Sequence, residues 1–233
     1  MPRHPRAAIG GLVYHVLNRA NARRQIFFRD NDSAAFERTL AEALARRPLE
    51  LFWYCLMPNH WHLVARPKDD GDLSQFMRWL TVTHTQRWHA CHHTSGSGHL
   101  YQGRFKSFPV EADQHFLTLC RYVERNALRA GLWPRAQDWR WSSLWRRRQC
   151  ERDTATLPGL SAWPVEEPVE WAGAGESTAV GVGRGGAAAL DPQGPAIGFA
   201  RISGVDRRGA GPAAHLPQPR QTLARPTVHE RQE

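Results

Sequence analysis

Two histidines separated by one residue close a hydrophobic run, in the triplet His60-Trp61-His62. Because successive side chains of a strand point to opposite faces, His60 and His62 would share a face and Trp61 would pack on the other. Two imidazoles on one face can bind the same divalent metal ion. The competing interpretation is a half-buried strand on which two histidines alternate, which is more common for an isolated triplet. A metal site therefore requires further residues from elsewhere in the chain.

A second set of reactive side chains lies on a helix that the sequence predicts over residues 113–130. Tyr122 and Asn126 are one turn apart on its polar stripe, so their side chains are neighbours. A phenol can attack phosphorus as a nucleophile, and a carboxamide oxygen is a hard ligand suited to Mg²⁺ or Mn²⁺. The competing interpretation of Tyr122 is an amphipathic residue at the edge of the core. Its pairing with the histidine triplet favours the chemical interpretation.

The elements that would carry these residues follow from periodicity and turn signals. Strands are predicted over residues 12–17, 49–56, 60–65 and 100–110, and helices over 34–47, 73–90 and 113–130. The 49–56 and 60–65 strands would form a hairpin that turns at Pro58 and Asn59. This order favours an α+β, ferredoxin-like antiparallel sheet with helices packed on one face.

Charge divides the chain into two parts. The full sequence carries 31 Lys and Arg against 22 Asp and Glu, with a pI of about 10.2, and the excess of basic residues lies within residues 1–150. A basic surface favours a polyanionic partner such as nucleic acid, although an Arg-rich soluble surface is the simpler alternative. The Arg and Lys residues that we expect to contact DNA phosphates are Arg19, Arg23, Arg24, Arg104, Lys106, Arg121, Arg125 and Arg129.

Residues 151–233 are rich in Gly, Pro, Ala and Arg and show no sustained period. We therefore expect a domain at residues 1–150 followed by a disordered tail, or a tail that arises from a shifted reading frame. The nucleotide sequence would test the second idea. The chain shows no signal peptide, no run long enough to span a membrane and no Cys-x-x-Cys pair, which predicts a cytoplasmic, nucleoid-associated protein with reduced cysteines.

Histidines and a cysteine also gather between residues 84 and 99. They match no zinc-ligand spacing, so a solvated His-rich loop is the preferred interpretation there. Exposed aromatic residues such as Trp88 or Tyr101 are expected to stack on unpaired bases, whereas most of the tryptophans are expected in the core.

Several segments together resemble a known family. Residues 122–131 read Tyr-Val-Glu-Arg-Asn-Ala-Leu-Arg-Ala-Gly and resemble the nucleophile helix of single-tyrosine HUH transposases, most closely the REP-associated tyrosine transposases with their IS200-like domain. Similar pieces occur in the family's order at residues 14–19, 57–64, 101–107 and 141–143, within a span of about residues 9–145. The family commonly reads Asn-Pro-Val after the tyrosine, where this chain has Asn-Ala-Leu at 126–128.

The resemblance implies a nuclease whose sheet carries the histidine pair. By motif, His60 and His62 would be metal ligands, Asn126 the third ligand and Tyr122 the nucleophile. Mg²⁺ or Mn²⁺ would be the metal, and the implied reaction cleaves and rejoins single-stranded or hairpin DNA of repeated palindromes through a 5′-phosphotyrosine. The protein would act as a monomer or homodimer.

A phenol titrates near pH 10, so the metal or a cation must stabilise its ionised form, for which Arg125, Arg129 and Lys106 are candidates. Two other readings stay open: a catalytically inactive, repressor-like DNA-binding module of the same fold, and a metallohydrolase that uses water while Tyr122 is structural.

Overall fold

The computed structural model describes residues 8–111, 114–149, 157–166 and Trp171. Most of the segment at 151–233, for which the sequence predicted disorder or a shifted frame, lies outside the described residues. No helix among the described residues is long and apolar enough to cross a membrane.

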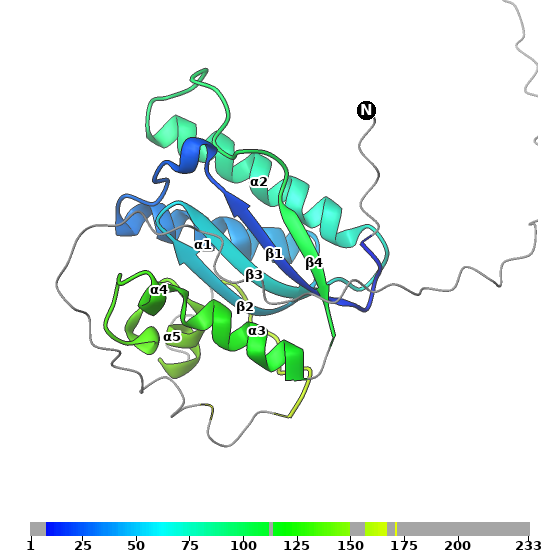
Figure 1. Ribbon diagram of the computed structural model, residues 1–233. Coiled ribbons are helices and arrows are strands. Elements are labelled where there is room, and N and C mark those ends of the chain that lie inside the picture. The colour runs from blue at the N-terminus through cyan, green and yellow to red at the C-terminus, as the bar shows by residue number, and fades with distance from the viewer. Residues whose placement is uncertain (1–7, 112–113, 150–156, 167–170, 172–233) are drawn as a thin grey trace, which may run out of the picture. The chain divides into compact units, whose positions relative to one another are not determined.

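The described chain forms one four-stranded antiparallel sheet with helices (Figure 1). The strands have the spatial order β2-β3-β1-β4. Because β1 and β2 are each antiparallel to β3, which lies between them, the first three strands form a split β-α-β unit of the ferredoxin-like kind. The elements are β1 (Val13–Arg19), η1 (Asn21–Arg23), α1 (Asp30–Arg46), β2 (Glu50–Met57), β3 (His60–Arg66), α2 (Asp72–Cys91), β4 (Lys106–Val110), α3 (Gln114–Glu124), α4 (Asn126–Arg129), η2 (Ala136–Asp138) and α5 (Ser143–Arg148).

The α+β class with an antiparallel sheet is confirmed, but the helices cover both faces of the sheet rather than one (Figure 1). On one face, β-strand residues such as Trp61 and Leu63 pack with Phe36 of α1 and Phe76 of α2. The opposite face forms a second core in which strand residues pack against α3 and α4; its members include Trp53, Cys55, Val64, Phe116, Leu119, Val123 and Ala127. The apolar stripe of α3 packs on the second face of the sheet, because α1 and α2 already cover the first face.

The last predicted strand and the last predicted helix differ from the structure in ways that bear on the site. The helix expected over residues 113–130 is interrupted at Arg125, where α3 ends and the four-residue α4 begins. The strand expected over 100–110 begins only at Lys106, and Tyr101 forms an isolated bridge with Ala20. Backbone bonds from Asn21 N to Leu100 O and from Gln102 N to Arg19 O hold the intervening loop beside the end of β1.

The packed region also extends past residue 150, where the sequence placed the domain boundary. Ser161 N donates to Leu51 O of the edge strand β2, and Trp163 and Trp171 pack into the second core. We call residues 157–166 together with Trp171 the C-terminal strap. It is attached by single side chains and one backbone hydrogen bond. Such contacts produce no hydrophobic periodicity, so the sequence did not predict them.

Candidate active site

The predicted histidine pair lies on the face of the sheet that α3 and α4 cover. His60 and His62 alternate along β3 with Trp61, which is buried in the core on the other face. Strand register places Arg19 of β1 opposite His60, and Leu17 opposite His62. Residues opposite each other in an antiparallel sheet share a face, so Arg19 flanks the histidine pair.

A third histidine joins the pair. Nε2 of His15 lies 2.9 Å from Nδ1 of His62, and the two rings stack with centroids 5.2 Å apart. The arrangement that leaves a lone pair on Nε2 of His62 has its Nδ1–H donate to Nε2 of His15. His62 is then oriented by its neighbour, and its Nε2 is available to a metal ion.

His60 is oriented in a similar way by the hairpin turn. Its Nδ1 lies 2.6 Å from Oδ1 of Asn59, and an amide oxygen accepts only, so the Nδ1–H donates and Nε2 keeps its lone pair. The rings of His60 and His62 meet edge to face with centroids 5.0 Å apart. Both imidazoles therefore have one nitrogen fixed by a hydrogen bond and the other open for coordination.

Burial keeps these histidines neutral. Desolvation lowers the pKa of His15 to about 4. Desolvation, with a smaller contribution from the Arg19 cation, lowers the pKa of His60 to about 4. The pKa of His62 is also well below its usual value, chiefly because of burial and then because of His15, His60 and Arg19. Since metals bind the neutral imidazole, the site is prepared for a cation at neutral pH.

Tyr122 of α3 lies beside this group. Its ring meets the ring of His62 edge to face, with centroids 6.2 Å apart, and Cζ of Arg129 lies 4.9 Å from the centre of the tyrosine ring. Arg19 also interacts electrostatically with Tyr122. The phenol is only partly buried, so a substrate can reach it. Two guanidinium groups thus lie near the Tyr122 ring, and of these the sequence indicated only Arg129 as a partner for the phenol.

Asn126 begins α4 one turn after Tyr122 and is buried. Its Nδ2 atom is enclosed and makes no hydrogen bond within the described chain. Rotation of the terminal amide would put Oδ1 in that position, and the two orientations are assigned from hydrogen bonding. In that orientation the enclosed position would hold an oxygen that could coordinate a cation in place of an unpaired donor.

The described residues contain no group of three or more His, Cys, Asp or Glu side chains that could hold a metal. A metal at the histidine pair would therefore use an amide oxygen, as Asn126 supplies, or oxygens of the substrate and water. Such a mixed set of nitrogen and oxygen ligands would suit Mn²⁺ or Mg²⁺. Structural zinc instead prefers four thiolate and imidazole ligands.

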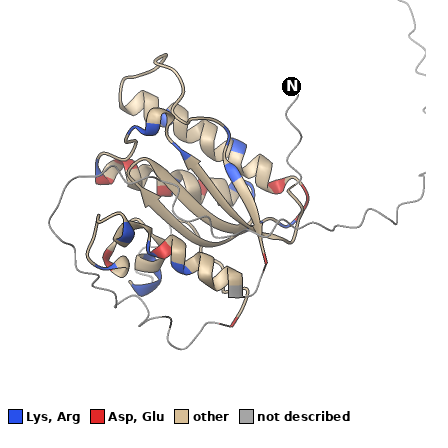
Figure 2. Cartoon of the chain, in the orientation of Figure 1, with Lys and Arg blue, Asp and Glu red and all other residues tan. Residues whose placement is uncertain are grey.

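The candidate DNA-contacting residues gather in two regions. Arg19 and Arg23 lie at the end of β1 and in η1, near the histidine pair, and Arg24 follows them with its guanidinium on the ring of Trp88. Figure 2 shows further Lys and Arg positions, coloured blue, on the α3, α4 and α5 side of the sheet. In that region Arg121 and Arg129 are exposed and Arg125 is partly buried, while Arg104 and Lys106 are exposed before and in β4.

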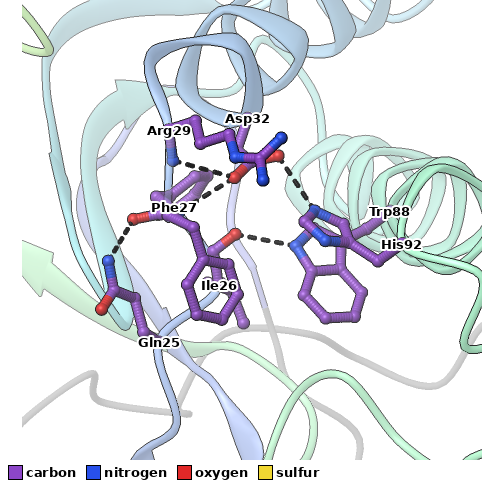
Figure 3. Close-up of polar contacts among 8 residues, drawn as sticks. Gln25, Ile26, Phe27, Arg29, Asp32, Trp88 and His92 are labelled. Carbon is purple, nitrogen blue, oxygen red and sulfur yellow. Dashed lines mark hydrogen bonds and ion pairs between the residues drawn. The ribbon is translucent and has the colours of Figure 1, made fainter.

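Two aromatic residues that we expected to stack on bases are instead buried. Trp88 donates from Nε1 to Ile26 O, and His92 stacks on it and pairs with Asp32, so this corner fastens the loop before α1 to the end of α2 (Figure 3). The hydroxyl of Tyr101 contacts Trp61 Nε1 in the core. The prediction that these two rings are exposed is wrong, because their polar atoms bond to neighbouring segments.

Sequence reasoning missed His15 and Asn59 as orienting residues. Both occur in segments that resemble the family, but neither has a spacing to His62 or His60 that predicts a hydrogen bond. For His15 the available signal was its position: it interrupts a largely apolar run, on the strand face that also carries Val13 and Leu17.

The Transposase IS200 like family matches residues 8–126, which is more than half of the chain. The chain belongs to the IS200-like transposase family. The matched region contains the histidine pair, His15, Tyr122 and Asn126.

One solved structure shares the fold of this IS200-like transposase. A REP-associated tyrosine transposase bound to a REP hairpin is 20% identical over 72% of this chain and 99% of its own, with a TM-score of 0.53. A candidate transposase from Deinococcus radiodurans R1 is 18% identical over 53% of this chain and 97% of its own, with a TM-score of 0.38. No curated protein sequence matches the chain.

Proposed function

We propose that this transposase is a metal-dependent endonuclease and strand transferase that cleaves single-stranded or hairpin DNA through a covalent bond to Tyr122. The observation that carries the proposal is the position of the Tyr122 ring against the ring of His62. Nδ1 of His62 is hydrogen-bonded to His15, which leaves Nε2 of His62 open. A structural tyrosine at a core edge does not require an oriented histidine pair and a guanidinium on its ring. The family membership and the fold shared with a protein bound to a REP hairpin agree with this choice.

The proposed step is a transesterification. The Tyr122 oxygen attacks a DNA phosphorus, a new P–O bond forms to the phenol, and the P–O3′ bond breaks. The phenol gives up its proton and the departing 3′-oxygen takes one up, so the products are a 5′-phosphotyrosine and a strand that ends in a 3′-hydroxyl. Because the phosphodiester bond is exchanged and not lost, the reverse attack by a 3′-hydroxyl can join strands without an external energy source.

The residues that would hold the metal are His60, His62 and Asn126, and a bound Mg²⁺ or Mn²⁺ would supply Lewis-acid polarisation of the phosphate. His15 and Asn59 orient the two imidazoles, which holds the open nitrogens toward the phosphate site. Arg129 and Arg19 stabilise the negative charge on the Tyr122 oxygen before attack.

The DNA partner that we propose is a hairpin with unpaired flanks, as in repeated palindromic elements. Arg19 lies beside the histidine pair and Arg129 lies on the Tyr122 ring, so both can contact the DNA backbone near the cleaved phosphate. Affinity should then fall steeply with salt concentration, since phosphate contacts release counterions.

One assay separates this proposal from a catalytically inactive DNA-binding module and from a hydrolase that uses water. The protein is mixed with a labelled hairpin and Mn²⁺, and the products are separated under denaturing conditions. Labelled DNA that migrates with the protein, and is absent with Tyr122→Phe, supports the proposal. Cleavage without such a product supports the hydrolase, and binding without cleavage supports the inactive module.

A further inference from the structure

A buried carboxylate joins the nucleophile helix to two other parts of the fold. Oε1 of Glu124, the last residue of α3, accepts from Nε1 of Trp53 at 2.7 Å and from Nε1 of Trp171 at 3.2 Å. Glu124 and Trp171 are both buried, at 6% and 7% relative exposure. A buried carboxylate with two indole donors is an unusually specific contact, because any displacement leaves a polar group without its partner.

The position of Glu124 in the helix gives this contact its significance. Residues two apart on a helix point to nearly opposite sides, so Glu124 faces away from the histidine pair when Tyr122 faces it. Glu124 also precedes Arg125, where α3 stops and the four-residue α4 with Asn126 begins. A helix this short does not hold its place alone. The carboxylate is thus an anchor at the junction between the proposed nucleophile and the proposed third ligand.

Trp171 is itself firmly held. Its ring meets Trp163 edge to face with centroids 4.8 Å apart, and Cζ of Arg121 lies 4.8 Å from its centre. The rest of the C-terminal strap is bonded to β2, where Ser161 N donates to Leu51 O, and to α5, where Nη2 of Arg147 donates to Ser161 O. The strap therefore connects the edge strand to α3 through Arg121 and Glu124, one turn apart at the end of that helix.

We propose that Trp171 is a positioning residue for Tyr122, acting through Glu124, so that the C-terminal strap forms part of the active site's support. The proposal rests on the proposed function in one respect, since it takes Tyr122 as the nucleophile. The strap would affect the rate of attack on the phosphate and not the binding of DNA, because neither Trp171 nor Glu124 faces the histidine side of α3. Misplacement of a reacting group by about 1 Å can lower a rate by about 100-fold.

The test uses the full chain and its Trp171→Ala variant, with Trp133→Ala as matched control, since Trp133 is 47% exposed and lies outside both cores. Two quantities are measured: the rate of covalent adduct formation at saturating hairpin DNA with Mn²⁺, and amide hydrogen exchange in peptides from residues 114–129. We expect Trp171→Ala to form the adduct about 10- to 100-fold more slowly, with unchanged hairpin affinity and faster exchange in these peptides. Trp133→Ala should match the wild type in all three.

Conservative variants separate positioning from general stability. Trp171→Phe keeps an aromatic ring against Trp163 but lacks the N–H donor, so its rate should lie between those of Trp171→Ala and the wild type. This variant also replaces Trp171→Ala if that protein fails to fold. Glu124→Ala should slow the adduct as Trp171→Ala does, and Glu124→Gln, whose amide oxygen still accepts from both indoles, should be faster than Glu124→Ala. The double variant Glu124→Ala/Trp171→Ala should be no slower than Glu124→Ala alone, because the two residues act through one contact.

The proposal would be overturned if Trp171→Ala showed the same adduct rate and the same hydrogen exchange as Trp133→Ala. It would also be overturned if the losses of rate in the two single variants added up in the double variant. A wild-type protein that forms no adduct would contradict the proposed function of Tyr122. In that case the exchange comparison would still decide whether Trp171 anchors α3.

Discussion

Nε2 of His15 in β1 lies 2.9 Å from Nδ1 of His62 in β3, in the buried layer between the sheet and α3. This contact fixes which nitrogen of His62 faces the site. It also joins two adjacent strands beside the Tyr122 ring, so the orientation of a proposed metal ligand depends on a residue 47 positions earlier in the chain. A ligand held by such a hydrogen bond needs no reorientation when a metal binds.

Replacement of His15 should weaken the metal site without removing a ligand. We expect His15→Ala to require roughly 10- to 100-fold more Mn²⁺ for half-maximal cleavage, because His62 loses its hydrogen-bond partner. High Mn²⁺ should restore most of the rate. The measurement is a Mn²⁺ titration of hairpin cleavage, with His99→Ala as control because that side chain is exposed. The same Mn²⁺ dependence for His15→Ala as for the wild type would contradict an orienting role.

Replacement of His62 itself should have a different result. His62→Ala removes a proposed ligand, so cleavage should be lost at every Mn²⁺ concentration while the hairpin is still bound through the basic residues. Cleavage by gel electrophoresis and affinity by fluorescence anisotropy are measured on the same preparation. If affinity falls as much as cleavage does, His62 has a structural or DNA-binding role instead.

The neutral histidines make stability depend on pH. Burial holds the pKa of His15 and His60 at about 4 in the folded state, whereas an unfolded histidine titrates near pH 6.5. The unfolded chain therefore binds more protons between these values, and the free energy of unfolding should fall as pH drops from about 6.5 to about 4. Glu124, whose pKa burial raises to about 7, acts in the opposite direction, because its contribution is lost as pH rises from about 4.5 to 7.

Urea unfolding at pH 7, 6 and 5 measures this dependence. His15→Asn removes one of the titrating groups, so its free energy of unfolding should change less with pH than that of the wild type. An equal slope in both proteins would show that folding does not lower the pKa of His15.

Arg129 should act on the chemical step. Its guanidinium lies on the Tyr122 ring, so Arg129→Met should slow adduct formation by about 10-fold or more at saturating DNA, and Arg129→Lys should retain part of the rate. Arg38→Met is the matched control, since Arg38 is exposed on α1 beyond the other face of the sheet. If Arg129→Met needs more DNA to reach half of the maximal rate, but its maximal rate is unchanged, Arg129 is instead a contact to a DNA phosphate.

The parts of the fold that could be predicted are those in which apolar residues recur with the period of a strand or a helix. Alternation in residues 60–65 placed His60 and His62 on one face, and the helical period of residues 113–130 placed Tyr122 and Asn126 on one side. The break at Arg125 was not predictable from the same period, because the backbone bonds from Arg125 N to Arg121 O and from Arg129 N to Arg125 O nearly continue the helix across it.

Contacts between distant segments were beyond a sequence argument. Nothing in the spacing of His15 and His62 indicates that β1 and β3 are neighbours, and the polar bonds that bury Trp88 and Tyr101 come from loops. Trp171 follows a stretch without periodicity, yet its indole reaches Glu124. Such residues were identified only when the sheet order and the packing of α3 were known.

The central claim is that the oxygen of Tyr122 forms the bond to DNA, and peptide mapping tests it most directly. The wild-type protein is trapped with a hairpin and Mn²⁺, the DNA is digested to its last nucleotide, and the protein is cleaved with trypsin. Because Arg121 and Arg125 flank it, the tyrosine is released in the four-residue peptide 122–125. We predict that this peptide carries a 5′-phosphonucleotide on Tyr122. A nucleotide on any other residue, or cleaved DNA with no modified peptide, would contradict the proposal.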